Sequence, residues 1–169
     1  MDWKFKLVHR AEEIDLTITE TNVTLGDAFS PATPATRLST MNWATSGTVK
    51  LYSANMDFIA EYGAGERMMV SDPVHLAYSK AVLIASSPEV KYYCLSGRMG
   101  GYWTGEVITL SPNESMSLTG ILGKAMFVSS GSLVGKDTHA LVHFKTLDTY
   151  DIQAGEEGAI LAIAFKEDE

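Results

Sequence analysis

The chain has 169 residues, with 13 Lys and Arg against 21 Asp and Glu, a formal net charge of −8 and 46% hydrophobic residues. This length suits one domain with a sizeable core, and the composition is that of a globular rather than a disordered chain. An acidic chain without a basic cluster repels a phosphate backbone, so nucleic acid is not expected as a partner. The single cysteine, Cys94, excludes an intramolecular disulfide framework and a cysteine-rich zinc site.

The N-terminal residues do not form a charged region followed by an apolar one, which is the pattern of a secretory signal. No apolar run approaches the ~20 residues that a membrane helix needs. We therefore expect no secretory signal and no membrane span. The expected location is the cytoplasm, or the interior of an organelle or virion.

In chain order, the sequence predicts strand after strand. Ile14, Leu16 and Ile18 alternate with polar residues, which indicates a half-buried antiparallel strand. Similar short apolar or alternating runs, separated by turn residues, predict an all-β fold with little or no helix. Its repeated antiparallel units would form a sandwich, a jelly roll or a barrel. The expected strands are 5–9, 14–19 with a continuation at 23–25, 48–53, 56–61, 67–71, 75–78, 81–86, 90–95, 107–110, 115–118, 124–129, 139–144, 150–153 and 159–165.

Two stretches interrupt this regular pattern. Residues 26–46 are rich in Pro, Ala and Thr, and Pro31 and Pro34 cannot donate to a central ladder. We expect a loop or arm there, within a single β domain that spans residues 1–169. Residues 73–85 (PVHLAYSKAVLIA) contain good helix formers, but their neighbours favour a strand.

A recurring unit of apolar strand, tight turn with glutamate and second apolar strand appears three times, at 58–70, 107–118 and 150–161. The turn glutamates Glu66, Glu114 and Glu156 stand 48 and 42 residues apart, close to the length of a four-stranded unit. We interpret these glutamates as structural punctuation that meets solvent, a turn amide or a basic side chain. Glu156 and Glu157 are neighbours, so on a strand they face opposite sides and cannot act as an acid–base pair.

The strings GEVITLSPNE at 105–114 and YGAGE at 62–66 resemble the turns of the mitochondrial-inheritance (AIM-type) family of bacterial and organellar proteins. The resemblance covers residues 47–165. That family has the fold of the tryptophan RNA-binding attenuation protein. The resemblance therefore implies repeated β units in a pseudo-threefold body, frequent trimers and no established enzymatic chemistry.

Among the residues that could carry chemistry, His139 and His143 are four apart, so on a strand both would point to the same face. With a carboxylate they could bind a metal as in a cupin. The His-x-His, Glu and later His order of a cupin is not present, however, so we expect satisfied strand histidines and no metal or other cofactor. Cys94 lies in an apolar strand, where a thiol is usually packed and inert.

Together these features predict a non-catalytic, structural β domain that is not an enzyme and that self-assembles into a homo-oligomer, a trimer or larger. A first alternative is a viral or phage capsid, decoration or filament subunit. A second is a cupin-like metal-dependent enzyme using His139 and His143. Aromatic, proline and apolar residues at the arm, the glycine-rich loop and the last strand are the expected interface: Pro31, Pro34, Tyr102, Trp103, Ile160, Ile163 and Phe165.

Overall fold

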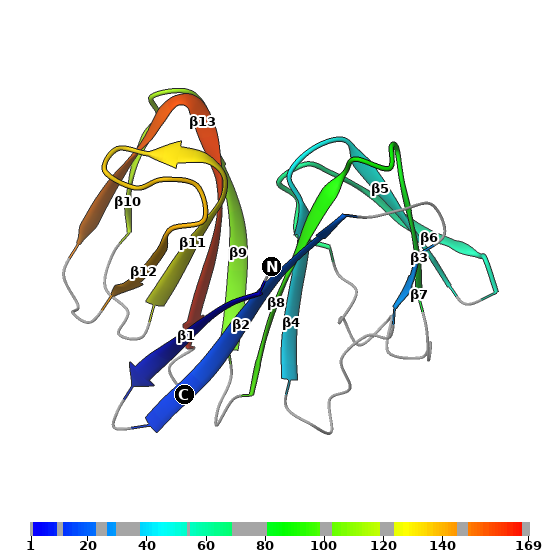
Figure 1. The fold of residues 1–169 in the computed structure, drawn as a ribbon, viewed down its shortest axis with the longest axis horizontal. Coiled ribbons are helices and arrows are strands. Elements are labelled where there is room, and N and C mark those ends of the chain that lie inside the picture. The colour runs from blue at the N-terminus through cyan, green and yellow to red at the C-terminus, as the bar shows by residue number, and fades with distance from the viewer. Residues whose placement is uncertain are drawn as a thin grey trace. The chain divides into compact units, whose positions relative to one another are not determined.

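The computed structural model describes residues 2–9, 12–22, 27–29, 38–53, 55–68, 81–98, 103–118, 124–144 and 149–166. Among these residues it contains 13 strands and no helix, which confirms the all-β prediction (Figure 1). This part of the chain accordingly holds no helix with the length and apolar character needed to cross a membrane.

The chain divides into two compact units. Unit 1 comprises Met1–Lys4 and Leu16–Met99, and unit 2 comprises Phe5–Asp15 and Gly100–Glu169. The described strands form two four-stranded sheets and one five-stranded sheet. The prediction of a single domain over residues 1–169 stays a prediction.

The first sheet has the order β1-β2-β8-β4, and the second has the order β3-β7-β5-β6. Strand β5 shows why these segments form strands: Val49, Leu51 and Ser53 are buried, while Lys50 between them is exposed. Val49 and Leu51 join an apolar core with other buried residues of unit 1. The strands of these two sheets are β1 (Asp2–His9), β2 (Glu12–Asn22), β3 (Asp27–Phe29), β4 (Leu38–Ala44), β5 (Thr48–Ser53), β6 (Phe58–Gly63), β7 (Ala81–Ala85) and β8 (Lys91–Arg98).

The third sheet, in unit 2, has the order β10-β13-β11-β12, with β9 also paired to β13. Strand β13 runs over 17 residues and bends back in its middle, as Figure 1 shows. Its first part pairs with β10, and its last part lies between β9 and β11. The strands of this sheet are β9 (Trp103–Leu110), β10 (Ser115–Leu118), β11 (Lys124–Leu133), β12 (Leu141–Phe144) and β13 (Tyr150–Lys166).

The apolar run at the end of β13 is explained by its central position. Ala159, Leu161, Ala162 and Ile163 are all buried, and neighbouring strands cover both edges of this segment. Leu161 and Ile163 belong to the apolar core of unit 2. Burial in the core of unit 2 thus accounts for the apolar character of this segment.

Several predicted strand boundaries are wrong. The strands expected at 150–153 and 159–165 are one continuous strand, which bends at Gly155 to Gly158 and pairs with different neighbours on either side of the bend. Gly158 makes the bend possible with its positive φ of 77°. The strand expected at 67–71 is reduced, within the described residues, to an isolated bridge between Met68 and Asn42.

The stretch 26–46, expected as a loop or arm, contains strands β3 and β4. Strand β4 pairs with β8, and its residues Asn42, Trp43 and Ala44 are buried. The prediction of a loop over the whole stretch is wrong because the two prolines lie in the segment between these strands and not within either strand. That segment is outside the described residues. In the stretch 73–85, residues 81–85 form β7, whereas 73–80 lie outside the described residues, as do the expected strand 75–78 and the continuation 23–25.

Candidate functional site

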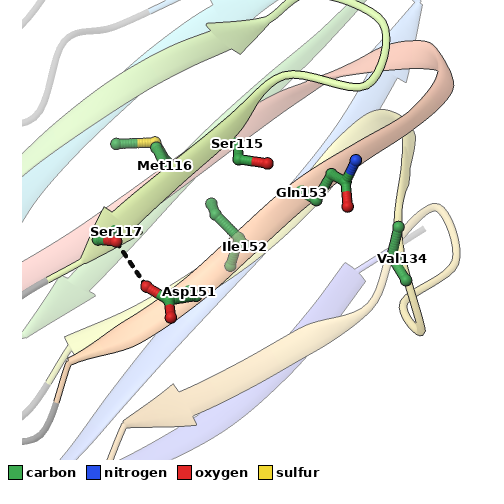
Figure 2. Close-up of a pocket in the computed structure, with 7 residues that line it drawn as sticks. All are labelled: Ser115, Met116, Ser117, Val134, Asp151, Ile152 and Gln153. Carbon is green, nitrogen blue, oxygen red and sulfur yellow. Dashed lines mark hydrogen bonds between the residues drawn. The ribbon is translucent and has the colours of Figure 1, made fainter.

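A hollow of about 620 Å³ opens on unit 2 beside strands β10 and β13 (Figure 2). This size lies within the range of small-molecule sites. Side chains of both strands and of the turn that follows β11 line it: Ser115, Met116, Ser117, Val134, Asp151, Ile152 and Gln153.

The register of the β10–β13 ladder decides which of these side chains face the solvent. Ser115 pairs with Gln153, and Ser117 pairs with Asp151. Because alternate residues of a strand share a face, these four polar side chains lie together, and all four residues are exposed. The intervening Ile152 is 5% exposed and belongs to the core. The ladder therefore places one polar face over one apolar face.

Two hydrogen bonds hold the polar side chains in place. The Ser117 hydroxyl donates to Asp151 Oδ1 at 2.5 Å, and Figure 2 shows the two side chains reaching toward each other. Gln153 Nε2 donates to the carbonyl of Asn113 at 3.3 Å. Each bond restricts rotamers that an exposed side chain would otherwise sample. The polar face is thus partly ordered before any ligand arrives.

The turn between β9 and β10 sets one end of the hollow. The Ser111 amide donates to Glu114 Oε2 at 2.7 Å, and the Glu114 amide donates to the Ser111 carbonyl at 3.0 Å. The Asn113 amide donates to the carbonyl of Gly155, in the bend of β13, at 3.1 Å. Glu114 therefore meets a turn amide, as expected from sequence, and it anchors β10 against the bend.

The turn glutamates differ in their settings. The Glu66 amide donates to the Gly63 carbonyl at 3.3 Å, so Glu66 also closes a tight turn. Glu156 lies exposed at the bend of β13, where no turn separates two strands. The repeated strand–turn–strand unit is thus confirmed at its second position, whereas the first has a strand and a turn followed by an isolated bridge, and the third is a bent strand.

The polar face offers more hydrogen-bond acceptors than the described chain uses. The Asp151 side chain makes one hydrogen bond among the described residues, through Oδ1, and the Gln153 side chain makes one through Nε2. Asp151 Oδ2 and Gln153 Oε1 therefore have no partner within the described part of the chain. The Ser115 hydroxyl also forms no hydrogen bond there. These groups can accept hydrogen bonds from a bound molecule.

The candidate interface residues are distributed over the described and undescribed parts. Pro31, Pro34 and Tyr102 lie outside the described residues. The structure describes only the backbone of Trp103 and Phe165, which pair with Lys166 and Thr104 respectively. Ile163 is buried in the core of unit 2, and Ile160 is partly buried. The interface and the homo-oligomer stay predictions, although the core already explains why Ile163 is apolar.

The two histidines do not share a strand. His139 lies in a turn before β12 with a φ of 70°, and its ring stacks on Phe127 with centroids 5.8 Å apart. His143 lies in β12 with its backbone opposite Ala125. The expectation that both lie on one strand is therefore wrong. Among the residues that the structure describes, no three His, Cys, Asp or Glu side chains gather as a metal site.

Cys94 lies in β8 opposite Asn42, and burial raises the pKa of its thiol to about 11. A thiol with such a pKa is almost entirely protonated at neutral pH and is a poor nucleophile. The prediction of a packed, inert cysteine is consistent with this environment.

The residues of the hollow were missed by sequence reasoning. The available signal was alternation, since Ser115 and Ser117 flank Met116 just as Asp151 and Gln153 flank Ile152. That pattern is typical of any half-exposed strand. Only the register of β10 on β13 shows that the two polar pairs form one surface.

No family model and no curated protein matches this chain. Several solved structures match it. A conserved protein of unknown function from Pseudomonas aeruginosa PAO1 aligns with a TM-score of 0.58 at 13% identity, covering 90% of this chain and 80% of that one. The protein YhaK from Escherichia coli aligns with a TM-score of 0.54 at 11% identity, covering 99% and 93%. At these identities the likeness concerns the fold alone.

Further matches have lower TM-scores. Among them are quercetin 2,3-dioxygenase from Acinetobacter baumannii (TM-score 0.48, 9% identity, covering 98% of this chain and 79% of that one), a nickel-bound bacterial pirin from Escherichia coli (0.46, 8%, 99% and 92%) and a cupin 2 conserved barrel domain protein from Leptotrichia buccalis (0.37, 9%, 99% and 89%).

These comparisons correct the predicted function. The two matches with TM-scores above 0.5 concern the fold alone, and the described part of this chain is all-β. The prediction of a self-assembling scaffold, with its capsid or filament alternative, is wrong, because the named neighbours include a dioxygenase, a pirin and a cupin barrel. None of them belongs by name to the AIM-type or attenuator-protein families, and that resemblance stays a prediction.

Proposed function

We propose that this protein binds a small polar molecule in the hollow beside β10 and β13. One exposed face of the β10–β13 ladder carries the Asp151 carboxylate, which a hydrogen bond from Ser117 holds in place. The same face carries hydrogen-bonding groups that have no partner among the described residues, and this combination is the observation that carries the proposal. Binding sites characteristically combine an apolar floor with a few placed polar groups. Here Val134 is the exposed apolar lining residue, and Asp151 and Gln153 are the polar groups.

Pre-organisation supports the same proposal. Ordering a long polar side chain on binding costs about 0.5–1.5 kcal/mol. The Ser117–Asp151 and Gln153–Asn113 hydrogen bonds hold both side chains in the free protein. A ligand that binds these two side chains in their existing conformations therefore causes a smaller loss of side-chain entropy than it would on an ordinary exposed strand.

The test is a titration of the ¹⁵N-labelled full chain with a chemically diverse set of small fragments, followed by amide chemical-shift mapping. The expected result is that at least one fragment class shifts the amides of Ser115, Ser117, Asp151 and Gln153 together and saturably. The variant Asp151→Asn should weaken that response, whereas Asp57→Asn, the same change at an exposed position of unit 1, should not. If no fragment shifts the hollow, or if the shifts map elsewhere, the proposal is overturned.

Metal-dependent chemistry of the cupin type is a second candidate function. The observation that favours it is that the backbone of each histidine lies beside strand β11. His143 pairs with Ala125, and the His139 amide donates to the Val128 carbonyl at 2.6 Å. Imidazole nitrogens are common ligands of Zn, Ni and Fe. Elemental analysis of untagged protein should then find stoichiometric metal that is lost in both His139→Ala and His143→Ala. Metal retained in both variants would exclude this pair as ligands.

A further inference from the structure

We propose that the ligand of the hollow is a neutral, hydroxyl-rich ring, that is, a monosaccharide or a cyclic polyol. This inference rests on the binding function proposed above, and it names the ligand class from the chemistry of the same polar face. Hydrogen-bond balance, spacing and charge each support it.

The unpartnered hydrogen-bonding groups of the polar face favour a ligand that has many hydrogen-bond donors. The Ser117 hydroxyl donates its hydrogen to Asp151, and the Gln153 side-chain amide donates one hydrogen to the Asn113 carbonyl. What these two pairs leave without a partner in the described chain is mainly acceptors, Asp151 Oδ2 and Gln153 Oε1. A hydroxyl group donates one hydrogen and still accepts others, so neighbouring hydroxyls can satisfy a carboxylate and an amide oxygen together.

The spacing of the polar face suits a ring with several hydroxyls. Side chains opposite each other on an antiparallel ladder have Cβ atoms about 5 Å apart. Alternate residues along one strand are separated by about 7 Å. The pairs Ser115–Gln153 and Ser117–Asp151 therefore mark the corners of a polar rectangle. One ammonium group can bridge acceptors about 5–6 Å apart, which is one short edge of this rectangle, whereas hydroxyls arranged around a ring can reach groups along its whole length.

Charge argues against an anionic ligand. None of the seven residues that line the hollow is a Lys, Arg or His, and Asp151 is the one acid among them. The chain as a whole carries a net charge of −8. A phosphate or carboxylate group on the ligand would meet repulsion from Asp151 with no lining cation to offset it.

The turn after β11 provides an apolar side to the hollow. Val134 is 69% exposed, and its amide donates to the Gln153 carbonyl at 2.9 Å, which ties the turn to the polar face. Figure 2 shows the Val134 side chain on the loop beside Gln153. A sugar or polyol ring presents C–H groups beside its hydroxyls, so it can contact Val134 while its hydroxyls reach Asp151 and Gln153.

The experiment is a chemical-shift titration of the full chain with three groups of probes. The neutral probes are glucose, galactose, mannose and myo-inositol, the cationic probes are ethanolamine and 1,4-diaminobutane, and the anionic probe is glucose 6-phosphate. We expect at least one neutral probe to shift Ser115, Ser117, Asp151 and Gln153 saturably, with glucose 6-phosphate weaker than glucose. Asp151→Asn removes the charge that strengthens the ligand's hydrogen bond to this side chain. The Kd of the neutral probe should therefore rise about tenfold or more. Asp57→Asn should leave Kd unchanged.

The outcomes separate the ligand class from the binding function. If the amines shift the hollow and the neutral probes do not, the inference about hydroxyl-rich ligands is overturned while the proposed binding function stands. If neither these probes nor the diverse fragments shift the hollow, both are overturned. A neutral probe that shifts the hollow equally in wild type and Asp151→Asn would overturn the role given to the carboxylate, and the argument for this ligand class with it.

Discussion

Gly131 of β11 approaches Gly158 of β13 so closely that a Cβ on Gly131 would lie 2.1 Å from the Gly158 carbonyl oxygen. Both residues have positive φ, 69° and 77°. They lie where the β11–β13 register shifts and where β13 bends away from β9 toward β10. This glycine contact therefore permits the bend that shapes the hollow.

We expect Gly131→Ala to destabilise the protein strongly. A positive φ costs a residue with a Cβ of order 1–3 kcal/mol, and a steric overlap with a fixed backbone atom adds about 1–3 kcal/mol. The matched control is Gly135→Ala, because Gly135 has a φ of 79° but a Cβ added there would meet no atom within 4 Å. Urea unfolding should show a lower free energy of unfolding for Gly131→Ala than for Gly135→Ala. Equal losses would mean that the close contact does not constrain the fold.

We expect the turn glutamate Glu114 to contribute to stability through one hydrogen bond to the Ser111 amide. Glu114→Ala should lower the free energy of unfolding by about 1 kcal/mol. Glu156 is exposed at the bend and makes no such bond among the described residues, so Glu156→Ala should change stability by less than about 0.5 kcal/mol. Denaturant unfolding of both variants checks this difference, and a reversed order would refute the structural role of Glu114.

Stability should fall in alkaline solution because of Tyr93. Burial raises the pKa of Tyr93, and Glu20, which accepts its hydroxyl hydrogen at 3.3 Å, adds to the effect. A folded-state pKa above the unfolded value of about 10 stabilises the protein below that pH. The contribution is then lost as pH rises toward the folded pKa. Tyr93→Phe should show a shallower decline above pH ~10 than wild type.

The variant Glu20→Gln serves as the partner test for Tyr93. It keeps an acceptor for the Tyr93 hydroxyl but removes the charge and the ion pair to Lys91, whose Nζ lies 3.0 Å from Glu20 Oε1. Because burial is the larger cause of the raised pKa, Glu20→Gln should reduce the alkaline decline only in part. Identical pH profiles for wild type and Tyr93→Phe would show that other groups control alkaline unfolding.

Cys94 should react slowly with thiol reagents while the protein is folded. With a pKa of about 11, roughly one thiol in a thousand is a thiolate near pH 8. An unfolded cysteine with a pKa of about 8.5 is ionised to roughly a quarter at that pH. Reaction with an aromatic disulfide reagent should therefore accelerate at least about a hundredfold when guanidinium chloride is added. Rapid labelling of the native protein would show that Cys94 is accessible and not held as described.

The sequence predicted the strands more reliably than their connections. The residues of β5 and β10 match the expected ranges, because alternation and continuous apolar runs reflect burial directly. Gly155 and Gly158 are compatible with a turn between two strands and with a bend within one strand, so the sequence predicts a turn where the structure has a bend. Whether a glycine ends a strand or bends it depends on its neighbours, here Leu110 and Gly131.

The candidate site was less accessible to sequence reasoning. Histidines and aromatic residues are the candidates that a sequence offers because their chemistry is distinctive, yet His139 lies in a turn and stacks on Phe127. The hollow is instead built largely from serines, an aspartate and a glutamine, which are ordinary surface residues when taken singly. Ser117 and Asp151 are 34 residues apart in the chain, and only strand pairing brings the Ser117 hydroxyl to 2.5 Å from Asp151 Oδ1.

By itself, the amino-acid sequence determined that this chain forms strands and no helix in its described part, because apolar periodicity and turn residues act locally. It also determined the acidic charge that argues against anionic ligands. Only the tertiary structure decided which strands pair, that β13 passes from one partner to another, and that two polar pairs meet over an apolar core. The physical reason is that register and strand order depend on contacts between distant segments, which no local pattern encodes.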